Sequence, residues 1–115
     1  MPALTEGIVL IVEYRVPLDN QATFIARMHN SCIETLADKG CTRMEFTRSI
    51  DDDEVFFLTE RWDHQRYIDI HRRKPNHDEE HRITDVMLTH KRVRKSHVYA
   101  NAWDPITFIS KPQAT

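Results

Sequence analysis

The segment between Glu60 and His81 carries the side chains that acid–base chemistry on a small organic molecule needs. Glu60 and Trp62 stand two positions apart in an apolar strand, and His71 follows in the next helix. An imidazole can take or give a proton near neutral pH, a carboxylate can orient it, and an indole can stack on a planar ring. We therefore predict that His71 and Glu60 are catalytic and that Trp62 binds an aromatic or enediol-like substrate.

The same residues also have structural interpretations, which the sequence leaves open. His71 could be a half-exposed histidine at a helix C-terminus, where the helix dipole favours a positive charge. Glu60 could form an ion pair with Arg15, Arg43 or His71, and Trp62 could simply fill the core at a strand end. Tyr14, Phe46, Phe56 and Phe57 are more typical of a core or an interface than of a binding site.

His77 and His81 are four positions apart, so they share one face of a helix, where two imidazoles can chelate a metal. A zinc-protease motif needs Glu at position 78, which is Asp78 here. A third ligand would have to come from His71 or Glu60. We therefore predict no metal site and no cofactor, and a divalent metal at His77 and His81 is the less favoured alternative.

The composition is that of an ordinary soluble domain. The chain has 115 residues, 30% of them charged and 40% hydrophobic, and its net charge is -2. These values point to one domain and give no sign of binding to nucleic acid or a membrane. No signal-peptide pattern or bilayer-spanning apolar run is present, so we expect a cytoplasmic protein. Cys32 and Cys41 lack metal-pair spacing and are expected to be free thiols.

The hydrophobic pattern predicts strands at residues 7–16, 41–49, 55–62 and 92–101. The basic run Lys91–Lys95 is interrupted by Val93, which is typical of a strand with one solvated edge. Asp63 should cap a short helix that carries Tyr67, Ile68 and His71 and ends before Pro75.

Two further helices complete the pattern. The first should begin at Asp19 or Asn20 and end at a left-handed Gly40. Its apolar stripe should be Phe24, Ile25, Met28, Cys32, Ile33 and Leu36. The last helix should be capped by Asn76, with Ile83, Val86, Met87 and Leu88 on its apolar side.

The predicted order β-α-β-β-α-α-β belongs to the α+β class and describes a ferredoxin-like, split β-α-β arrangement. An antiparallel sheet would be covered by helices on one side, and its open face should expose the aromatic and aliphatic half of each strand. Such a patch is too apolar for a monomer, so we predict a symmetric homodimer. The single domain would span residues 1–115, with a core at 7–101 and a C-terminal tail at 102–115.

Several short motifs resemble the antibiotic biosynthesis monooxygenase superfamily of dimeric α/β barrels. They are Val12–Val16, Phe24, Lys39-Gly40-Cys41 and, most specifically, Leu58-Thr59-Glu60-Arg61-Trp62 followed by Tyr67, His71 and Pro75. The resemblance covers about residues 7–101. The family pattern continues with a Thr-Pro-His step, which is Lys74-Pro75-Asn76 here, so the usual second histidine is replaced and His77 lies one place later.

The resemblance implies one of three activities on a small-molecule substrate. Members of the superfamily oxidise polyketide phenols or quinols with dioxygen and without metal or flavin. A second branch isomerises the phosphorylated autoinducer-two signal, for which Lys91–Lys95 would hold the phosphate. A third branch binds and degrades haem, and His81 stands at the offset of its axial histidine. The second tryptophan of that branch would fall at His71, which counts against haem oxygenation.

We therefore favour a cofactor-independent monooxygenase that oxidises a phenol or hydroquinone with dioxygen. His71 would take the phenolic proton, Glu60 would orient His71, and Trp62 would stack on the ring. Arg43 or Arg15 would stabilise the anion. Substrate binding is further assigned to Glu13, Arg43, Tyr67 and His81. The alternatives are an isomerase or tautomerase of a small hydroxy-ketone and a haem-binding dimer.

Overall fold

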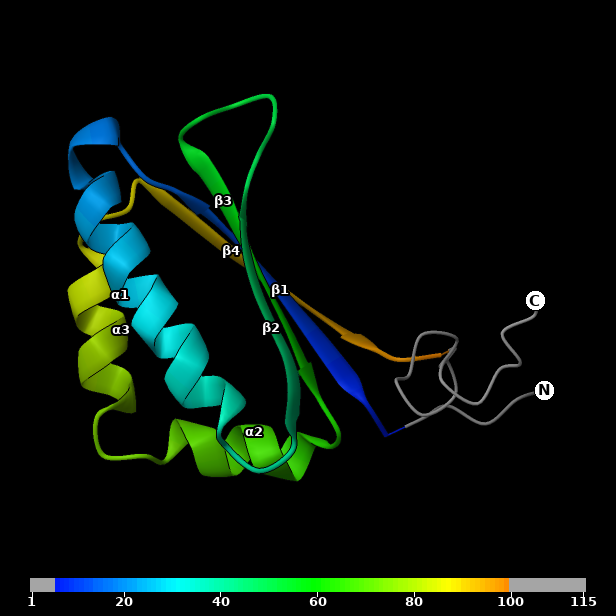
Figure 1. Cartoon of the computed structure of the whole chain (residues 1–115). Helices are drawn as coiled ribbons and strands as arrows, with labels where there is room; N and C mark the ends of the chain where they lie inside the picture. The colour runs from blue at the N-terminus through cyan, green and yellow to red at the C-terminus, as the bar shows by residue number, and fades with distance from the viewer. Residues whose placement is uncertain (1–5, 100–115) are drawn as a thin grey trace.

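The computed structural model describes residues 6–99 and confirms the predicted α+β order. The elements are β1 (Ile8–Arg15), α1 (Leu18–Leu36), β2 (Cys41–Arg48), β3 (Val55–Trp62), α2 (Gln65–Arg72), α3 (His77–Asp85) and β4 (His90–His97). The strands pair antiparallel in the order β2-β3-β1-β4, which is the ferredoxin-like topology (Figure 1). The predicted tail and the end of the predicted last strand lie outside the described residues.

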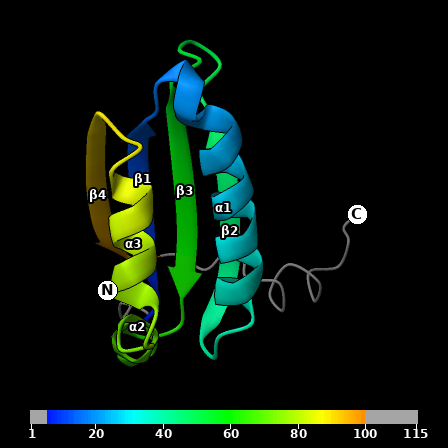
Figure 2. The same ribbon diagram turned by 90° about the vertical axis from the view of Figure 1, so that its left-hand side faces the viewer.

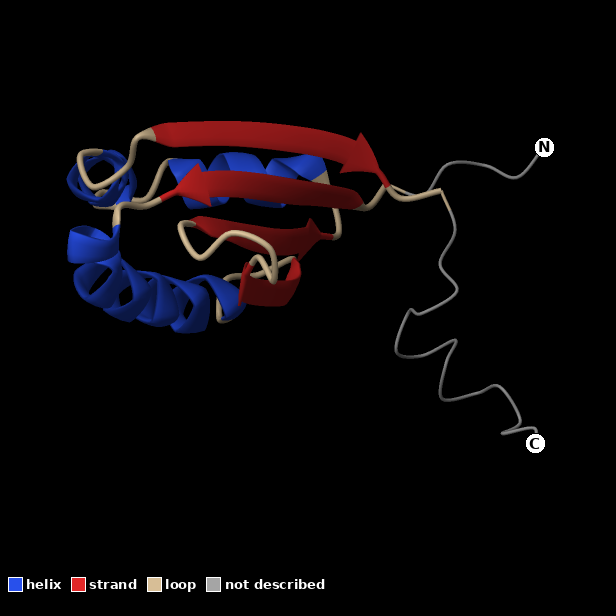
Figure 3. Cartoon of the chain, turned by 90° about the horizontal axis from the view of Figure 1, so that it is seen from above, coloured by secondary structure: helices blue, strands red, loops and turns tan. Residues whose placement is uncertain are grey.

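The helices cover one face of the sheet. α1 and α3 run side by side across that face, and α2 closes one end (Figure 2). Seen from above, the strands lie edge to edge, with β2 and β4 at the two edges (Figure 3). Within residues 6–99, no helix is long and apolar enough to cross a membrane.

The core lies between the sheet and the helices because β1 and β3 bury alternate residues. Ile8 pairs with Trp62 and Tyr14 with Phe56, so these four side chains share the helix-facing side. A first cluster gathers Tyr14, Phe24 and Phe56, with Phe24 fully buried. A second cluster gathers Ile8, Leu10, Cys41, Trp62 and Ile68. These clusters fix the ends of β3 and α2, from which the candidate site residues project.

The open face of the sheet differs from the expectation. The aromatic rings of Tyr14, Phe46, Phe56 and Trp62 lie on the helix side, because the strand register places them together there. By strand alternation, the open face instead carries Val9, Ile11, Val55 and Phe57. Its small apolar centre is Ile11 and Phe57, which are diagonal neighbours, because Val9 lies opposite Arg61 and Val55 opposite Arg15, toward opposite ends of the strands. Charged residues flank that centre on every strand: Glu13, Arg15, Arg43, Glu45, Arg61, Arg92 and Arg94.

Several element ends also correct the predictions. His64, not Asp63, caps α2: its Nδ1 accepts a hydrogen bond from the Arg66 backbone N–H at 3.0 Å, whereas Asp63 pairs with Arg61. α1 follows Pro17 without a side-chain cap and ends at Leu36. Asn76 precedes α3, but its side chain makes no capping hydrogen bond. β4 begins at His90, two residues earlier than predicted.

Gly40 has the predicted positive φ, +88°, but it lies beyond the helix in the turn before β2. A Cβ atom at this position would meet the Tyr67 ring at 2.2 Å. Glycine is therefore required both by the backbone conformation and by the close approach of α2.

The face that α1 buries is rotated from the predicted stripe. Gln21, Phe24, Met28 and Thr35 are buried, whereas Ile25, Ile33 and Leu36 are exposed. The buried face of α1 therefore has a polar side chain at each end, Gln21 and Thr35, in place of an apolar one. Gln21 is accommodated because its amide donates to the Val16 and Asp53 carbonyls, at 3.0 and 2.8 Å.

Candidate active site

A cavity of about 130 Å³ lies between the sheet and the helices. Strand residues such as Leu10, Val12 and Leu58 form an apolar wall, and Met28 and Ile68 continue it from the helices. The polar and aromatic side chains around it include Tyr14, Arg27, Glu60, Trp62, His71, His77, His81 and Lys91. Four predicted residues, Glu60, Trp62, His71 and His81, thus line one cavity.

Glu60 and Trp62 are joined directly. They project from the same face of β3, and the Trp62 indole N–H donates to Glu60 Oε1 at 2.9 Å. Trp62 is fully buried, and its ring centre lies 5.2 Å from that of His71. The indole therefore bonds to the Glu60 carboxylate and packs beside the His71 imidazole.

The hydrogen-bond partner of His71 is Asp38, which the sequence did not reveal. His71 Nδ1 lies 2.6 Å from Asp38 Oδ2, and Lys74 Nζ donates to Asp38 Oδ1 at 2.8 Å. Burial acts to raise the pKa of Asp38, but the hydrogen bonds from Lys74 and His71 outweigh it and lower that pKa. The ionised Asp38 holds Nδ1 as a donor, so Nε2 of His71 is the nitrogen left for proton exchange.

Three histidines form a row along the cavity. The ring centres of His71 and His77 are 5.1 Å apart, and those of His77 and His81 are 4.3 Å apart. Burial lowers the pKa of His81, and the neighbouring His77 and Lys91 lower it further, so His81 favours the neutral form. Among residues 6–99, no group of three or more His, Cys, Asp or Glu side chains is arranged to hold a metal ion.

Tyr14 and the two cysteines keep their protons. Burial raises the pKa of Tyr14 well above its ordinary value, and the charge of Glu60 adds to the effect. Tyr14 therefore presents a neutral hydroxyl at the cavity. Burial also raises the pKa of Cys32, and it raises that of Cys41 to about 11. Both cysteines are free, as predicted, and as thiols they are poor nucleophiles.

Three predicted binding residues lie away from this cavity. Glu13 is on the open face of the sheet, where His90 Nε2 lies 3.1 Å from its Oε2. Arg43 is on the same face and donates to Glu45 at 2.6 Å. Tyr67 packs on the second core cluster and against Gly40. Arg15, the other candidate for anion binding, pairs with Asp52 and Glu54.

The basic run of β4 is divided between the two faces of the sheet. Lys91 lines the cavity and lies 3.0 Å from Asp85 and 3.4 Å from His81 Nδ1. Arg92 and Arg94 alternate onto the open face, and Lys95 donates to Gln65. Only one cation of the predicted phosphate-binding run therefore lines the cavity.

Comparison with known proteins identifies the family. The model of the antibiotic biosynthesis monooxygenase family matches residues 7–82, which include β1 to α2, most of α3 and thus Asp38, Glu60, Trp62 and His71. The chain belongs to the antibiotic biosynthesis monooxygenase family. A search of curated proteins found no match.

Solved structures share the fold of this family member. A candidate antibiotic biosynthesis monooxygenase from Nitrosomonas europaea is 15% identical, with a TM-score of 0.76 over 84% of this chain and 94% of its own. SnoaB, a cofactor-independent oxygenase from Streptomyces nogalater, is 12% identical, with a TM-score of 0.73 over 80% and 92%. Rv0793 from Mycobacterium tuberculosis is 21% identical, with a TM-score of 0.72 over 78% and 92%.

Proposed function

We propose that this chain is a cofactor-independent monooxygenase that oxidises a phenol or hydroquinone with dioxygen. The observation that carries the proposal is the Asp38–His71 pair, in which His71 lines the cavity beside Trp62 and Asp38 holds its Nδ1. Family membership supports an oxidoreductase that acts on a small molecule. Similarity to SnoaB, itself a cofactor-independent oxygenase, is consistent with chemistry that uses only side chains and substrate.

The reaction begins with removal of a proton. His71 Nε2 takes the phenolic proton, and the resulting anion is electron-rich enough to reduce dioxygen. One oxygen atom enters the ring and the other leaves as water, so a hydroquinone and dioxygen give a hydroxyquinone and water. The carbon–hydrogen bond at the attacked ring position breaks, and dioxygen accepts the four electrons that the ring loses.

Each neighbour of His71 has a distinct role in this proposal. Asp38 is a positioning residue that holds Nδ1 and stabilises the protonated ring. Trp62 forms a flat wall for the substrate ring, and its bond to Glu60 keeps that carboxylate turned inward. Tyr14, which remains neutral, can donate a hydrogen bond to the developing anion. The arginines proposed for that task from the sequence lie on the other face of the sheet.

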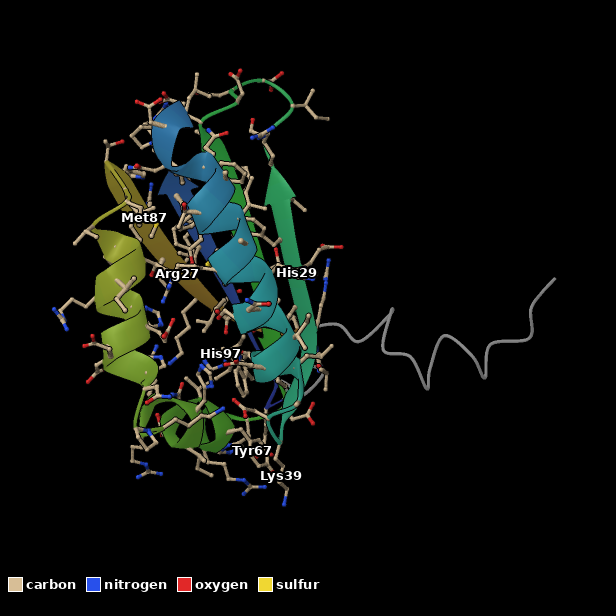
Figure 4. All side chains as sticks on the ribbon, turned by 60° about the vertical axis from the view of Figure 1, so that its left-hand side comes forward. Arg27, His29, Lys39, Tyr67, Met87 and His97 are labelled. Atoms are coloured by element: carbon tan, nitrogen blue, oxygen red, sulfur yellow. The ribbon has the colours of Figure 1, made fainter. Side chains whose placement is uncertain are left out.

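An oxygen electrode with quantitation of the quinone tests the proposal. His71→Ala should lower oxygen consumption with a hydroquinone at least about 100-fold, because a general base contributes factors of that size. The matched control is His29→Ala, which removes an exposed histidine from α1 (Figure 4) and should leave the rate unchanged. An unaltered rate in His71→Ala would remove His71 from the mechanism.

The variant Asp38→Asn distinguishes a positioning role of Asp38 from a role in substrate binding. This variant should lower kcat by about tenfold with little change in KM, because the amide can still occupy the site but no longer stabilises a protonated imidazole. A rise in KM at constant kcat would instead assign Asp38 to substrate binding.

A second candidate function is isomerisation of a small hydroxy-ketone, which Lys91 favours. Its ammonium lines the cavity beside His81, where it can hold an anionic substrate. The same His71 would move a proton between adjacent carbons. Turnover of a hydroxy-ketone under nitrogen, at the same rate as in air, would favour this function over the monooxygenase.

A homodimer and a cytoplasmic location remain part of the proposal. The open face supports the dimer, since an apolar centre ringed by opposite charges is suited to a second copy of itself.

A further inference from the structure

Arg27 stands at the mouth of the cavity with one donor unused. It projects from α1 toward α3 (Figure 4), where one of its terminal nitrogens lies 2.7 Å from Glu80 Oε2. The Arg27 Nε–H is buried and has no hydrogen-bond partner among the described residues. A buried donor without a partner is costly, so native structures keep few of them, and each calls for an explanation.

The surroundings of Arg27 change from polar to apolar along the path into the cavity. The inner wall includes Val12, Leu58 and Trp62. The outer groove is lined by Arg27, Asn30, Ser31, Glu34, Asn76 and Glu80. Arg27, Ser31 and Glu80 line both spaces. A ligand that fills both has an apolar planar end inside and a polar end at the mouth.

The charges at the mouth indicate which polar end fits. A guanidinium offers parallel N–H donors that match the two oxygens of a carboxylate. Glu34 and Glu80 also line the outer groove, and their negative charge disfavours a dianion such as a phosphate monoester. Of these two anions, a singly charged carboxylate pairs with Arg27 and is repelled less by Glu34 and Glu80.

The Arg27–Glu80 pair must open for a carboxylate to take both donors, because Glu80 occupies a terminal N–H of Arg27 and the Nε–H is buried. Exposed ion pairs are weak, and Glu80 is more than half exposed. An incoming carboxylate can therefore replace Glu80 and take both the Nε–H and a terminal N–H of Arg27. The substrate would thus break the Arg27–Glu80 ion pair when it binds.

We propose that Arg27 is a specificity residue that selects aromatic substrates carrying a carboxylate, in competition with Glu80. The inference rests on the proposed function for the nature of the ring, a phenol or hydroquinone. Recognition of the carboxylate does not depend on turnover, so it can be measured as binding alone.

Calorimetry with two matched probes tests the inference. Gentisate is a hydroquinone with a carboxylate, and gentisamide is its neutral carboxamide. The wild-type chain should bind gentisate about tenfold more tightly, as expected for one charge-assisted pair. Arg27→Gln should abolish this preference, and Glu80→Gln should increase it several-fold by removing the competitor. Arg82→Gln, which alters an exposed arginine of α3 paired with Glu79, should leave it unchanged.

Four results would overturn the inference: equal affinity for the two probes, no binding of either, a preference that survives in Arg27→Gln, or displacement of gentisate by an equal concentration of inorganic phosphate. If Arg27→Gln fails to fold, as a thermal melt would show, the increase expected in Glu80→Gln carries the test. Oxygen uptake separates the two proposals. Oxidation of both probes without a carboxylate preference removes only the inference, whereas a preference without oxygen uptake removes only the monooxygenase.

Discussion

Asp38 joins two cationic or protonatable side chains to one carboxylate, so its charge is tied to folding as well as to His71. Lys74 and His71 each contact one of its oxygens, and its side chain is only 19% exposed. Because these contacts lower the pKa of Asp38, its ionised form is stabilised in the folded state.

Asp38→Asn should therefore destabilise the fold in a pH-dependent way. Because the folded pKa of Asp38 is lowered, its contribution is complete above the unfolded pKa of about 3.9 and is lost as the pH falls through the folded pKa. At pH about 7 the variant should lose about 1 kcal/mol of unfolding free energy, and the difference should vanish near pH about 2. Urea denaturation at the two pH values measures both.

The control for this prediction is Asp69→Asn on α2, an exposed carboxylate that accepts one hydrogen bond from Gln65. It should change the unfolding free energy by less than about 0.5 kcal/mol at either pH. A loss in Asp38→Asn that is equal at both pH values would show that ionisation of Asp38 does not contribute.

At the residue scale the sequence predicted types of side chain better than their partners. Glu60, Trp62, His71 and His81 line one cavity, and the sequence could group them because motif and spacing place them on one strand face and two helices. Asp38 was missed because it lies in a turn 33 residues from His71, and only the fold brings them together. Arg27 left a weak signal: with Ser31 and Thr35 it forms a row at intervals of four along the helix, beside the apolar residues.

The elements are held together at one end by Gln21, whose side chain connects α1 to the loop before β3 and to β2. Its amide donates to two backbone carbonyls, and its Oε1 accepts from Arg48 at 2.5 Å. The guanidinium of Arg48 also lies over the Phe56 ring, 4.9 Å from its centre. This network therefore ties the N-terminal end of α1 to β2 and to the loop before β3.

Gln21→Leu should cost about 2–3 kcal/mol of unfolding free energy, because the Val16 and Asp53 carbonyls lose their amide donor. Chemical denaturation at neutral pH measures the loss. Thr23→Ala, at an exposed position of the same helix, should stay within about 0.5 kcal/mol of the wild type. A Gln21→Leu variant as stable as the wild type would mean that water replaces the amide.

Element order was predictable because each strand and helix has its own local pattern, bounded by Pro17, Gly40 and Pro75. The face that α1 buries was not predictable. The apolar residues of α1 surround more than half of the helix, so the sequence could not decide that Ile25, Ile33 and Leu36 face outward. The cap of α2 was misplaced for a similar reason: Asp63 and His64 both have an acceptor, and ion pairing with Arg61 engages the aspartate.

At the scale of the whole molecule, the open face of the sheet sets the expected assembly. Phe57 lies opposite Glu13 and Thr47 in neighbouring strands, in the apolar centre of that face. If two sheets pack face to face, a charge at this position would be buried without a partner in both copies.

Phe57→Asp should therefore convert a dimer into a monomer. Sedimentation equilibrium should report twice the chain mass of 13.7 kDa for the wild type and one chain mass for the variant. Ile70→Asp, which places the same charge at an exposed position of α2, should leave the dimer intact. A wild-type protein that sediments as one chain at micromolar concentration would contradict the assembly.

The charges of β4 affect whether a second copy of the chain can add a strand at this edge of the sheet. Within residues 6–99, β4 is an edge strand, and Lys or Arg occupies four of its eight positions and both of its faces. A second copy approaching that edge to extend the ladder would bring like charges into register. Fibril formation through this strand is therefore opposed by electrostatic repulsion, a protection that concentrated salt would weaken by screening.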